Sequence, residues 1–146
     1  MEHLYRTMAK DIDGRPRVGR SATTLGVRVE GAHADVHPDA HGRVHPGGGG
    51  MSVTIDDPQR MPTVRRPKWI VVAGAEGAGK HPLFALPAAV VPPALRVRRE
   101  SDDETEHARF AHGFVEPAEP TPLHRYEQDV AGTRQHWLEV SDGPRA

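Results

Sequence analysis

The sequence predicts an α+β fold, in which short antiparallel strands form small twisted sheets and one amphipathic helix near the C-terminus covers them. Two features of the composition support this prediction. The chain has 146 residues, of which 36% are hydrophobic, so it can bury one modest core as a single domain over residues 1–146. Gly and Pro contribute 15 and 14 residues, and because both interrupt regular structure, the elements must be short.

Strands are predicted where apolar and polar residues alternate between turn-forming residues. In chain order these segments are residues 4–6, 24–29, 51–55, 69–72, 83–86, 95–97 and 114–115. The segment 24–29 is equally compatible with an extended loop. Residues 31–50 are mostly Gly, Pro, Asp and His, which cannot easily bury a core face, and they predict a flexible loop. The acidic residues 101–106 predict a solvated connection, and residues 141–146 predict a disordered tail.

The C-terminal helix is predicted from a stripe of residues that are spaced three and four apart. They are Leu123, Tyr126, Val130, Thr133, Trp137 and Val140. On a helix this spacing places all six side chains on one face. Thr121 and Pro122 supply an N-cap and a first-turn residue. The sequence therefore predicts one well-formed helix that packs its striped face on a sheet.

Charge and cysteine content exclude several classes of function. The chain carries 19 basic and 20 acidic side chains, so its net charge of −1 provides no overall field to hold nucleic acid or an anionic membrane. Without cysteine it has no disulfide, no thiolate zinc site and no cysteine nucleophile. No segment approaches the about 18 apolar residues of a membrane span. We therefore expect no signal peptide or membrane anchor, and a cytoplasmic location in the producing cell.

The segment from Gly74 to His81 resembles a phosphate-binding loop. Gly74, four further residues, Gly79 and Lys80 have the spacing at which backbone amides cradle phosphates. However, His81 stands where a Ser or Thr hydroxyl would hold Mg²⁺, and Pro82 follows where the phosphate-binding helix would begin. The spacing therefore does not predict an NTPase.

Four histidines recur at every fourth residue, which on a helix would align them as metal ligands. They are His33, His37, His41 and His45. Two prolines and a glycine interrupt any such helix, and a flexible loop would lose much entropy on binding a metal. We interpret the segment as a solvated polar loop and predict no metal site.

Three short motifs occur in order along the chain: LYR at residues 4–6, GGGGMSV at 47–53 and GFVEPAEP at 113–120. Together with PPALRV at residues 92–97 and a terminal helix that ends at Trp137, they make the chain resemble the ADP-ribosyltransferase-like toxins of type VI secretion systems, the Tse-type toxins. The resemblance implies a fold of two split, twisted antiparallel sheets with NAD bound in the cleft between them. It also implies a cognate immunity protein, a macromolecular acceptor and delivery into the cytoplasm of a target cell.

The resemblance suggests three catalytic residues. The guanidinium of Arg6 would hold the NAD pyrophosphate, and the hydroxyl of Ser52 would face the nicotinamide ribose. Glu116 would stabilise the positive charge that develops on the ribose when the nicotinamide bond breaks, and the alternatives for this role are Glu100, Glu104 and Glu106 on a nearby loop.

Five further residues are expected to bind NAD. They are Tyr5, Gly49, Gly50, Met51 and Lys80, and the alternative for Lys80 is a contact with the immunity protein. Glycines without side chains would let the ligand approach the backbone closely.

The resemblance leaves the activity open. The chain would transfer ADP-ribose or hydrolyse NAD, and the alternatives are a non-catalytic module that retains the NAD cleft and a nucleic-acid end phosphotransferase. The last alternative requires basic residues spread over the cleft, whereas Arg65, Arg66 and Lys68 cluster in one loop. That cluster is more typical of a solvated or partner-binding surface than of a nucleic-acid site, because no aromatic residues are interleaved with it.

Overall fold

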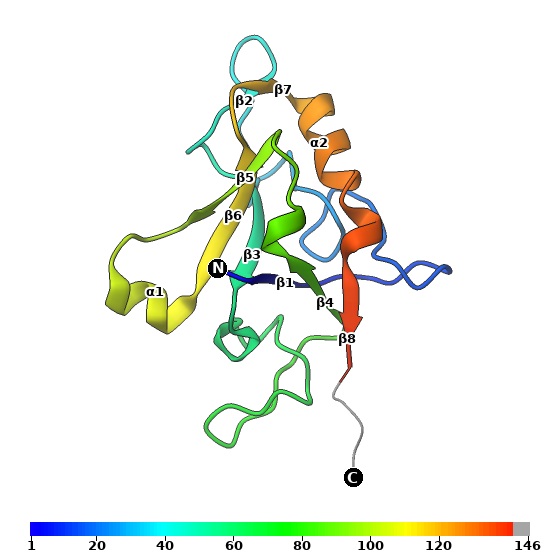
Figure 1. The fold of residues 1–146 in the computed structure, drawn as a ribbon, viewed down its shortest axis with the longest axis vertical. Helices are drawn as coiled ribbons and strands as arrows, with labels where there is room; N and C mark the ends of the chain where they lie inside the picture. Colours follow the sequence, from blue (N-terminus) through cyan, green and yellow to red (C-terminus); the bar gives the residue numbers. More distant parts are fainter. Residues whose placement is uncertain (142–146) are drawn as a thin grey trace.

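The computed structural model of the chain describes residues 1–141, except for the side chains of residues 107–109. At its centre is a six-stranded antiparallel sheet with the strand order β5-β6-β3-β1-β4-β8 (Figure 1). The strands are β1 (His3–Thr7), β3 (Met51–Ile55), β4 (Leu83–Pro87), β5 (Leu95–Arg99), β6 (His112–Pro117) and β8 (Leu138–Val140). A second sheet pairs β2 (Arg43–Val44) with β7 (Thr121–Pro122). The α+β class and the antiparallel pairing predicted from the sequence are confirmed.

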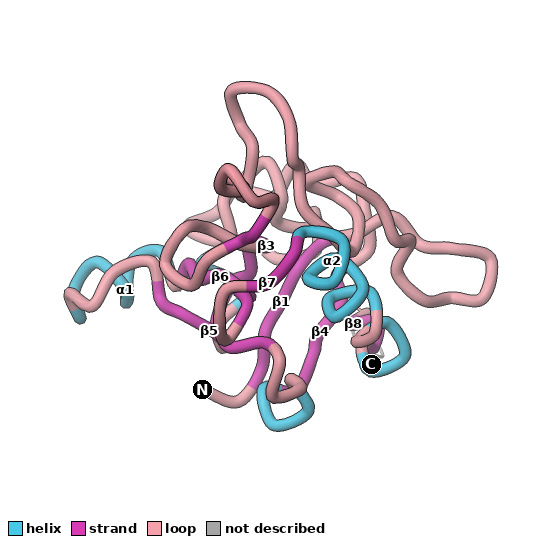
Figure 2. The backbone as a smooth tube through the Cα atoms, turned by 90° about the horizontal axis from the view of Figure 1, so that it is seen from above, coloured by secondary structure: helices cyan, strands magenta, loops and turns pink. Residues whose placement is uncertain are grey.

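Residues 1–141 contain two α-helices, α1 (Glu104–Phe110) and α2 (Leu123–Ala131). Three single turns of 3₁₀ helix accompany them: η1 (Pro58–Arg60), η2 (Ala88–Val90) and η3 (Arg134–His136). In Figure 2, α2 lies over the part of the sheet near β4 and β8, whereas α1 lies beyond β5 and β6 at the other side of the sheet. Loops make up much of the remaining chain. None of the helices in the described residues is long and apolar enough to cross a bilayer.

The large sheet is divided at the pair β1 and β3. These two strands pair only through Leu4 with Ile55 and Tyr5 with Thr54. Beyond this point β1 continues along β4 as far as Thr7, whereas β3 continues along β6 back to Met51. The sheet therefore consists of two wings, β1-β4-β8 and β3-β6-β5, and the gap that opens between β1 and β3 is called the fork below.

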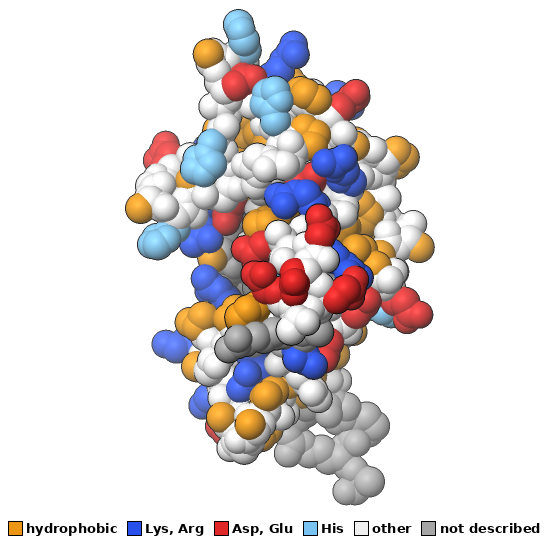
Figure 3. All heavy atoms as spheres, turned by 90° about the vertical axis from the view of Figure 1, so that its left-hand side faces the viewer, with side chains coloured by type: hydrophobic (Ala, Val, Ile, Leu, Met, Phe, Trp, Pro, Cys, Tyr) orange, Lys and Arg blue, Asp and Glu red, His pale blue; other side chains and the backbone are white. Residues whose placement is uncertain are grey.

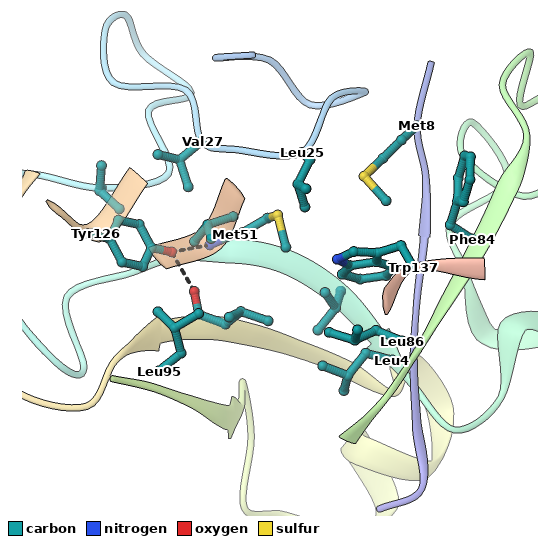
Figure 4. Close-up of a cluster of buried hydrophobic side chains, with 14 of the residues drawn as sticks. Leu4, Met8, Leu25, Val27, Met51, Phe84, Leu86, Leu95, Tyr126 and Trp137 are labelled. Atoms are coloured by element: carbon teal, nitrogen blue, oxygen red, sulfur yellow. Dashed lines mark hydrogen bonds between the residues drawn. The ribbon is translucent and has the colours of Figure 1, made fainter. Parts of the chain in front are cut away.

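The main hydrophobic core lies between the sheet and the elements that cover it. Trp137 is fully buried, and in Figure 4 its ring lies among side chains from the β1 and β4 region, including Met8 and Phe84. Tyr126 of α2 is also fully buried, and its hydroxyl accepts a hydrogen bond from Met51 N and donates one to Val115 O. This single hydroxyl thus ties α2 to both β3 and β6.

The C-terminal helix α2 is shorter than predicted, because it covers only the first part of the stripe from Leu123 to Val140. The helix ends at Ala131, and the chain then passes through η3 into β8. The side chain of Thr133 donates to Val130 O and accepts from the Trp137 indole, and Thr133 and Trp137 are buried although they lie beyond the helix. The predicted N-cap is also wrong, since Pro122 holds that position without a side-chain bond.

Five of the predicted strands, over residues 4–6, 51–55, 83–86, 95–97 and 114–115, are confirmed within β1, β3, β4, β5 and β6. Residues 24–29 form an extended loop, which was the alternative to a strand, and their residue Leu25 makes an isolated bridge with Val18. A strand over 69–72 is not formed, because Val72 bridges only to Ala75 in a tight turn. The acidic connection at 101–106 is partly helical, since the carboxylate of Asp103 accepts from Glu106 N and begins α1.

Residues 31–50 contact the core more closely than their composition predicts. Val36 and Val44 are almost completely buried and belong to the main hydrophobic cluster. Val36 also bridges to Gly49, and β2 pairs with β7. The two valines therefore anchor a segment that was expected to bury no core face. The predicted tail at 141–146 lies outside the described residues except for Ser141.

The face of the molecule drawn in Figure 3 carries side chains of both charge signs. In the view of Figure 3 histidine side chains gather towards the upper end of the molecule, and acidic side chains gather near the centre. The first turn of α1 contains two acidic residues, Glu104 and Glu106. The mixed surface agrees with the net charge of −1.

Candidate functional site

A pocket of about 170 Å³ lies at the fork between β1 and β3. From the strands it is lined by Tyr5, Arg6, Thr7, Ser52, Val53 and Thr54. These are the last paired residues of the two strands and the residues just beyond, where each strand has lost the other as a hydrogen-bonding partner. The pocket therefore exists because the sheet splits here.

Loops from three parts of the chain, together with β6, complete the wall. They contribute Ala22, Arg28, Asp35, Met61, Pro62, Arg65 and His112. The Arg28 guanidinium bonds to both carboxylate oxygens of Asp35, with an Nη2 to Oδ1 distance of 2.9 Å. The hydrogen bond to Asp35 raises the pKa of Arg28. His112 pairs through Nδ1 with Glu100 at 2.9 Å.

The arginines make this pocket positive. Arg65 has no side-chain partner among the side chains that the structure describes, and Asp35 balances only one of the three arginines that line the wall. Arg6 lies close enough to Arg65 and Arg28 for both to act against its charge. Because unbalanced cations in a recess attract anions, the pocket is suited to a phosphate-bearing ligand.

Hydroxyl groups on the strands also face the pocket. Thr7 and Thr54 are 3% and 5% exposed, and neither hydroxyl has a protein partner in the described part of the chain. The hydroxyl of Ser52, which is half-buried beside them, likewise has none there. Buried hydroxyls are normally hydrogen-bonded, so these groups indicate a site that water or a polar ligand occupies.

Arg6 is buried and its guanidinium bonds to backbone carbonyls rather than to a carboxylate. Nη1 donates to Ser52 O at 2.7 Å, while Nε and Nη2 donate to carbonyl oxygens of the 21–26 loop. Burial lowers the pKa of Arg6 to about 10, so it remains charged at neutral pH. Of the five N–H groups of a guanidinium, one on Nη1 is left for a ligand. The geometry makes Arg6 chiefly a clamp that holds the pocket wall, with little capacity to grip a pyrophosphate.

Glu116 lies away from the pocket, and this separates it from Arg6 and Ser52. Its carboxylate is completely buried and bonds to Arg98 at 2.7 Å, to Arg96 at 2.6 Å and to Gly47 N at 3.0 Å. Burial acts to raise the pKa of Glu116, but these three hydrogen bonds outweigh it and the pKa lies below its ordinary value. With both oxygens bound in this way, Glu116 fastens the glycine loop, residues 47–50, to β6. The geometry does not support a catalytic role.

The glycines before Ser52 serve packing between backbones. A side chain at Gly49 would clash with the carbonyl oxygen of Asp35, and one at Gly50 would clash with that of Val115. Met51 is buried in the core. None of Gly49, Gly50 and Met51 lines the pocket, so the structure gives them a supporting position rather than the ligand contact that the sequence suggests.

The phosphate-loop lookalike is a set of turns followed by a strand. Lys80 is exposed outside the pocket, and β4 begins at Leu83 where a nucleotide-binding loop would lead into a helix. A side chain at Gly77 or Gly79 would clash with backbone oxygens of residues 65–67. These glycines thus let the turn pack against the segment that carries Arg65.

The four regularly spaced histidines are exposed and do not converge. His45 pairs with Asp39 at 2.6 Å, and the hydrogen bond lowers the pKa of that carboxyl well below its usual range. Across the described residues, no group of three or more His, Asp or Glu side chains is placed to hold a metal ion.

Several pocket residues were not predicted from the sequence. Thr7 and Thr54 are next to predicted site residues, and their period-two position relative to Tyr5 and Ser52 could have identified them. By contrast, Asp35 lies in a segment expected to be a mobile loop, and Arg28 lies in an uncertain extended segment.

Comparison of the chain with protein-family models, curated protein sequences and solved structures gives no match.

Proposed function

We propose that this chain is a toxin domain that binds NAD in the pocket at the fork and transfers ADP-ribose to a target macromolecule or to water. The observation that carries the proposal is the fork itself. A sheet that splits into two wings, with a positive pocket at the split, has the form implied by the sequence resemblance to ADP-ribosyltransferase-like toxins. A cognate immunity protein and delivery into a target cell belong to the same proposal.

The polar groups of the pocket match the parts of NAD. Arg65 is available for the pyrophosphate, since it has no partner among the described side chains. The hydroxyls of Ser52 and Thr54 are available for the ribose and carboxamide, and Tyr5 is the aromatic residue among the strand residues that line the pocket.

The size of the pocket limits how much of NAD it can enclose. Its volume of about 170 Å³ is below the roughly 300–1,000 Å³ of sites that enclose a whole drug-sized ligand. The nicotinamide riboside end therefore occupies the pocket in this proposal. The adenosine end then lies across the open surface beside Arg65.

The proposed reaction breaks the bond between ribose C1′ and nicotinamide N1. The electron pair leaves with the nicotinamide, C1′ gains oxocarbenium character, and a nucleophile of the acceptor or a water molecule attacks C1′ and loses its proton to solvent. Groups fixed around the ribose before reaction stabilise the developing charge.

Binding and cleavage of NAD test the proposal directly. Calorimetric titration is expected to give saturable NAD binding, and chromatography is expected to detect nicotinamide release. Replacement of Arg65 by Ala should raise the Kd about tenfold, because a charge-assisted hydrogen bond is lost. Lys68→Ala, an exposed substitution in the same loop, is the matched control. Absence of NAD binding by the wild-type chain at millimolar concentration would sink the proposal.

One observation favours a second candidate, a non-catalytic module that binds NAD without cleaving it. The only carboxylate among the described pocket residues, Asp35, is paired with Arg28. The module predicts NAD binding without nicotinamide release, and without growth arrest when the chain is expressed in a bacterial cytoplasm. The toxin predicts growth arrest that Ser52→Ala relieves.

A further inference from the structure

We propose that Asp35, and not Glu116, is the carboxylate that stabilises the ribose during cleavage of the nicotinamide bond. This inference rests on the proposed NAD-cleaving function and names a catalytic residue for it. Asp35 lines the same pocket as Ser52 and Arg6, whereas Glu116 is enclosed by Arg96, Arg98 and Gly47 elsewhere on the sheet.

Asp35 is held in one orientation by Arg28. Its Oδ2 accepts hydrogen bonds from the backbone N and from Nε of Arg28, at 2.7 and 3.2 Å, and its Oδ1 accepts one from Nη2 at 2.9 Å. The backbone N of Asp35 in turn donates to Arg28 O at 2.8 Å. Each carboxylate oxygen can accept about two hydrogen bonds, so Oδ1 retains capacity for one more. A ribose hydroxyl in the pocket is a suitable donor.

The glycine loop holds the backbone that carries Asp35. Gly49 has φ of +109° and lies so close to Asp35 O that any side chain would clash with it. Val36, the next residue, bridges to Gly49 and is completely buried in the core. Gly49 is therefore a positioning residue for Asp35, which explains why a glycine is needed there although it does not touch the pocket.

A carboxylate that is fixed before reaction is suited to this chemistry. When the electron pair of the C1′–N1 bond leaves with nicotinamide, positive charge develops on the ribose, and a carboxylate hydrogen-bonded to a ribose hydroxyl stabilises it. Asp35 takes up no net proton in this step. The attacking water or acceptor releases its proton to solvent, so atoms and charge balance.

The test compares NAD binding with nicotinamide release for matched variants. Asp35→Asn keeps the shape of the side chain, and we expect it to lower the release rate by about 10²–10³ while the Kd for NAD changes less than about threefold. Asp39→Asn is the control, since Asp39 pairs with His45 in the same segment but does not line the pocket. It should change neither quantity.

Two further variants separate catalysis from positioning and guard against misfolding. If Asp35 acts only by holding Arg28, then Arg28→Gln and Asp35→Asn should weaken NAD binding alike, which would overturn the proposal. If circular dichroism shows Asp35→Asn to be unfolded, Asp35→Glu replaces it and should lower release at least tenfold by displacing the carboxylate. Unchanged release by this variant would also overturn the proposal.

The outcomes distinguish this inference from the function on which it rests. Wild-type release with no loss in Asp35→Asn, or with a larger loss in a Glu116→Gln variant that circular dichroism shows to be folded, rejects Asp35 and leaves the toxin function standing. NAD binding without release by the wild type rejects Asp35 as a catalytic residue and supports the module. No NAD binding rejects the function and Asp35 together.

Discussion

Nη1 of Arg6 donates a hydrogen bond of 2.7 Å to the backbone oxygen of Ser52, and this contact joins β1 to β3 just where their strand pairing has ended. The guanidinium therefore replaces strand hydrogen bonds across the fork. Its other bonds hold the 21–26 loop against the same opening. A single buried side chain thus keeps the pocket open and fixes part of its wall.

Replacement of Arg6 by Ala should destabilise the chain by about 3 kcal/mol, because several carbonyl oxygens lose a buried, charged donor. Urea unfolding measures this loss. Arg17→Ala is the control, since Arg17 is exposed and has no side-chain partner in the described part of the structure, and it should change stability by less than about 0.5 kcal/mol. Equal stability of the two variants would contradict the clamp.

Replacement of Gly49 by Ala should destabilise the chain more than the same change at Gly47. Both glycines have positive φ, which penalises Ala by about 1 kcal/mol. Only Gly49 lies against a backbone oxygen, that of Asp35, whereas a side chain at Gly47 meets nothing within 4 Å. We expect Gly49→Ala to cost at least about 2 kcal/mol beyond Gly47→Ala in thermal unfolding. Similar melting of both variants would show that the close approach is unimportant.

Glu116 should contribute a pH-dependent part of the stability. Its pKa in the folded chain lies below the ordinary value of 4.5, so its contribution is fully present above pH 4.5 and is lost as the pH falls through the lowered pKa. Glu116→Gln should therefore destabilise the chain by roughly 3 kcal/mol at pH 7, and by less at pH 3. Unfolding free energies at both pH values measure the difference.

The control for this prediction is Glu119→Gln, because Glu119 is exposed and its carboxylate has no partner in the described chain. Its effect should be small at both pH values. A loss for Glu116→Gln that does not shrink between pH 7 and pH 3 would show that the carboxylate does not act through its charge.

Much of the strand framework could be predicted because it depends on local patterning. Alternation at residues 51–55 gives β3, since Met51, Val53 and Ile55 must face the core while Ser52 faces away. The phosphate-binding loop could also be rejected from local sequence, because His81 and Pro82 directly follow Lys80. The end of α2 was not predictable in this way, because the chain after Gly132 passes through η3 into β8, and β8 pairs with the distant strand β4.

The sequence by itself determined the α+β class, most of the strands, the absence of cysteine chemistry, and Arg6 and Ser52 as candidate residues. Only the tertiary structure decided that Glu116 is enclosed by arginines and that Asp35, Arg28 and Arg65 share a pocket with Ser52. The physical reason is the range of the interactions. Strand patterns arise between residues two apart, whereas the pocket depends on where the sheet splits and on which distant loops cover the split.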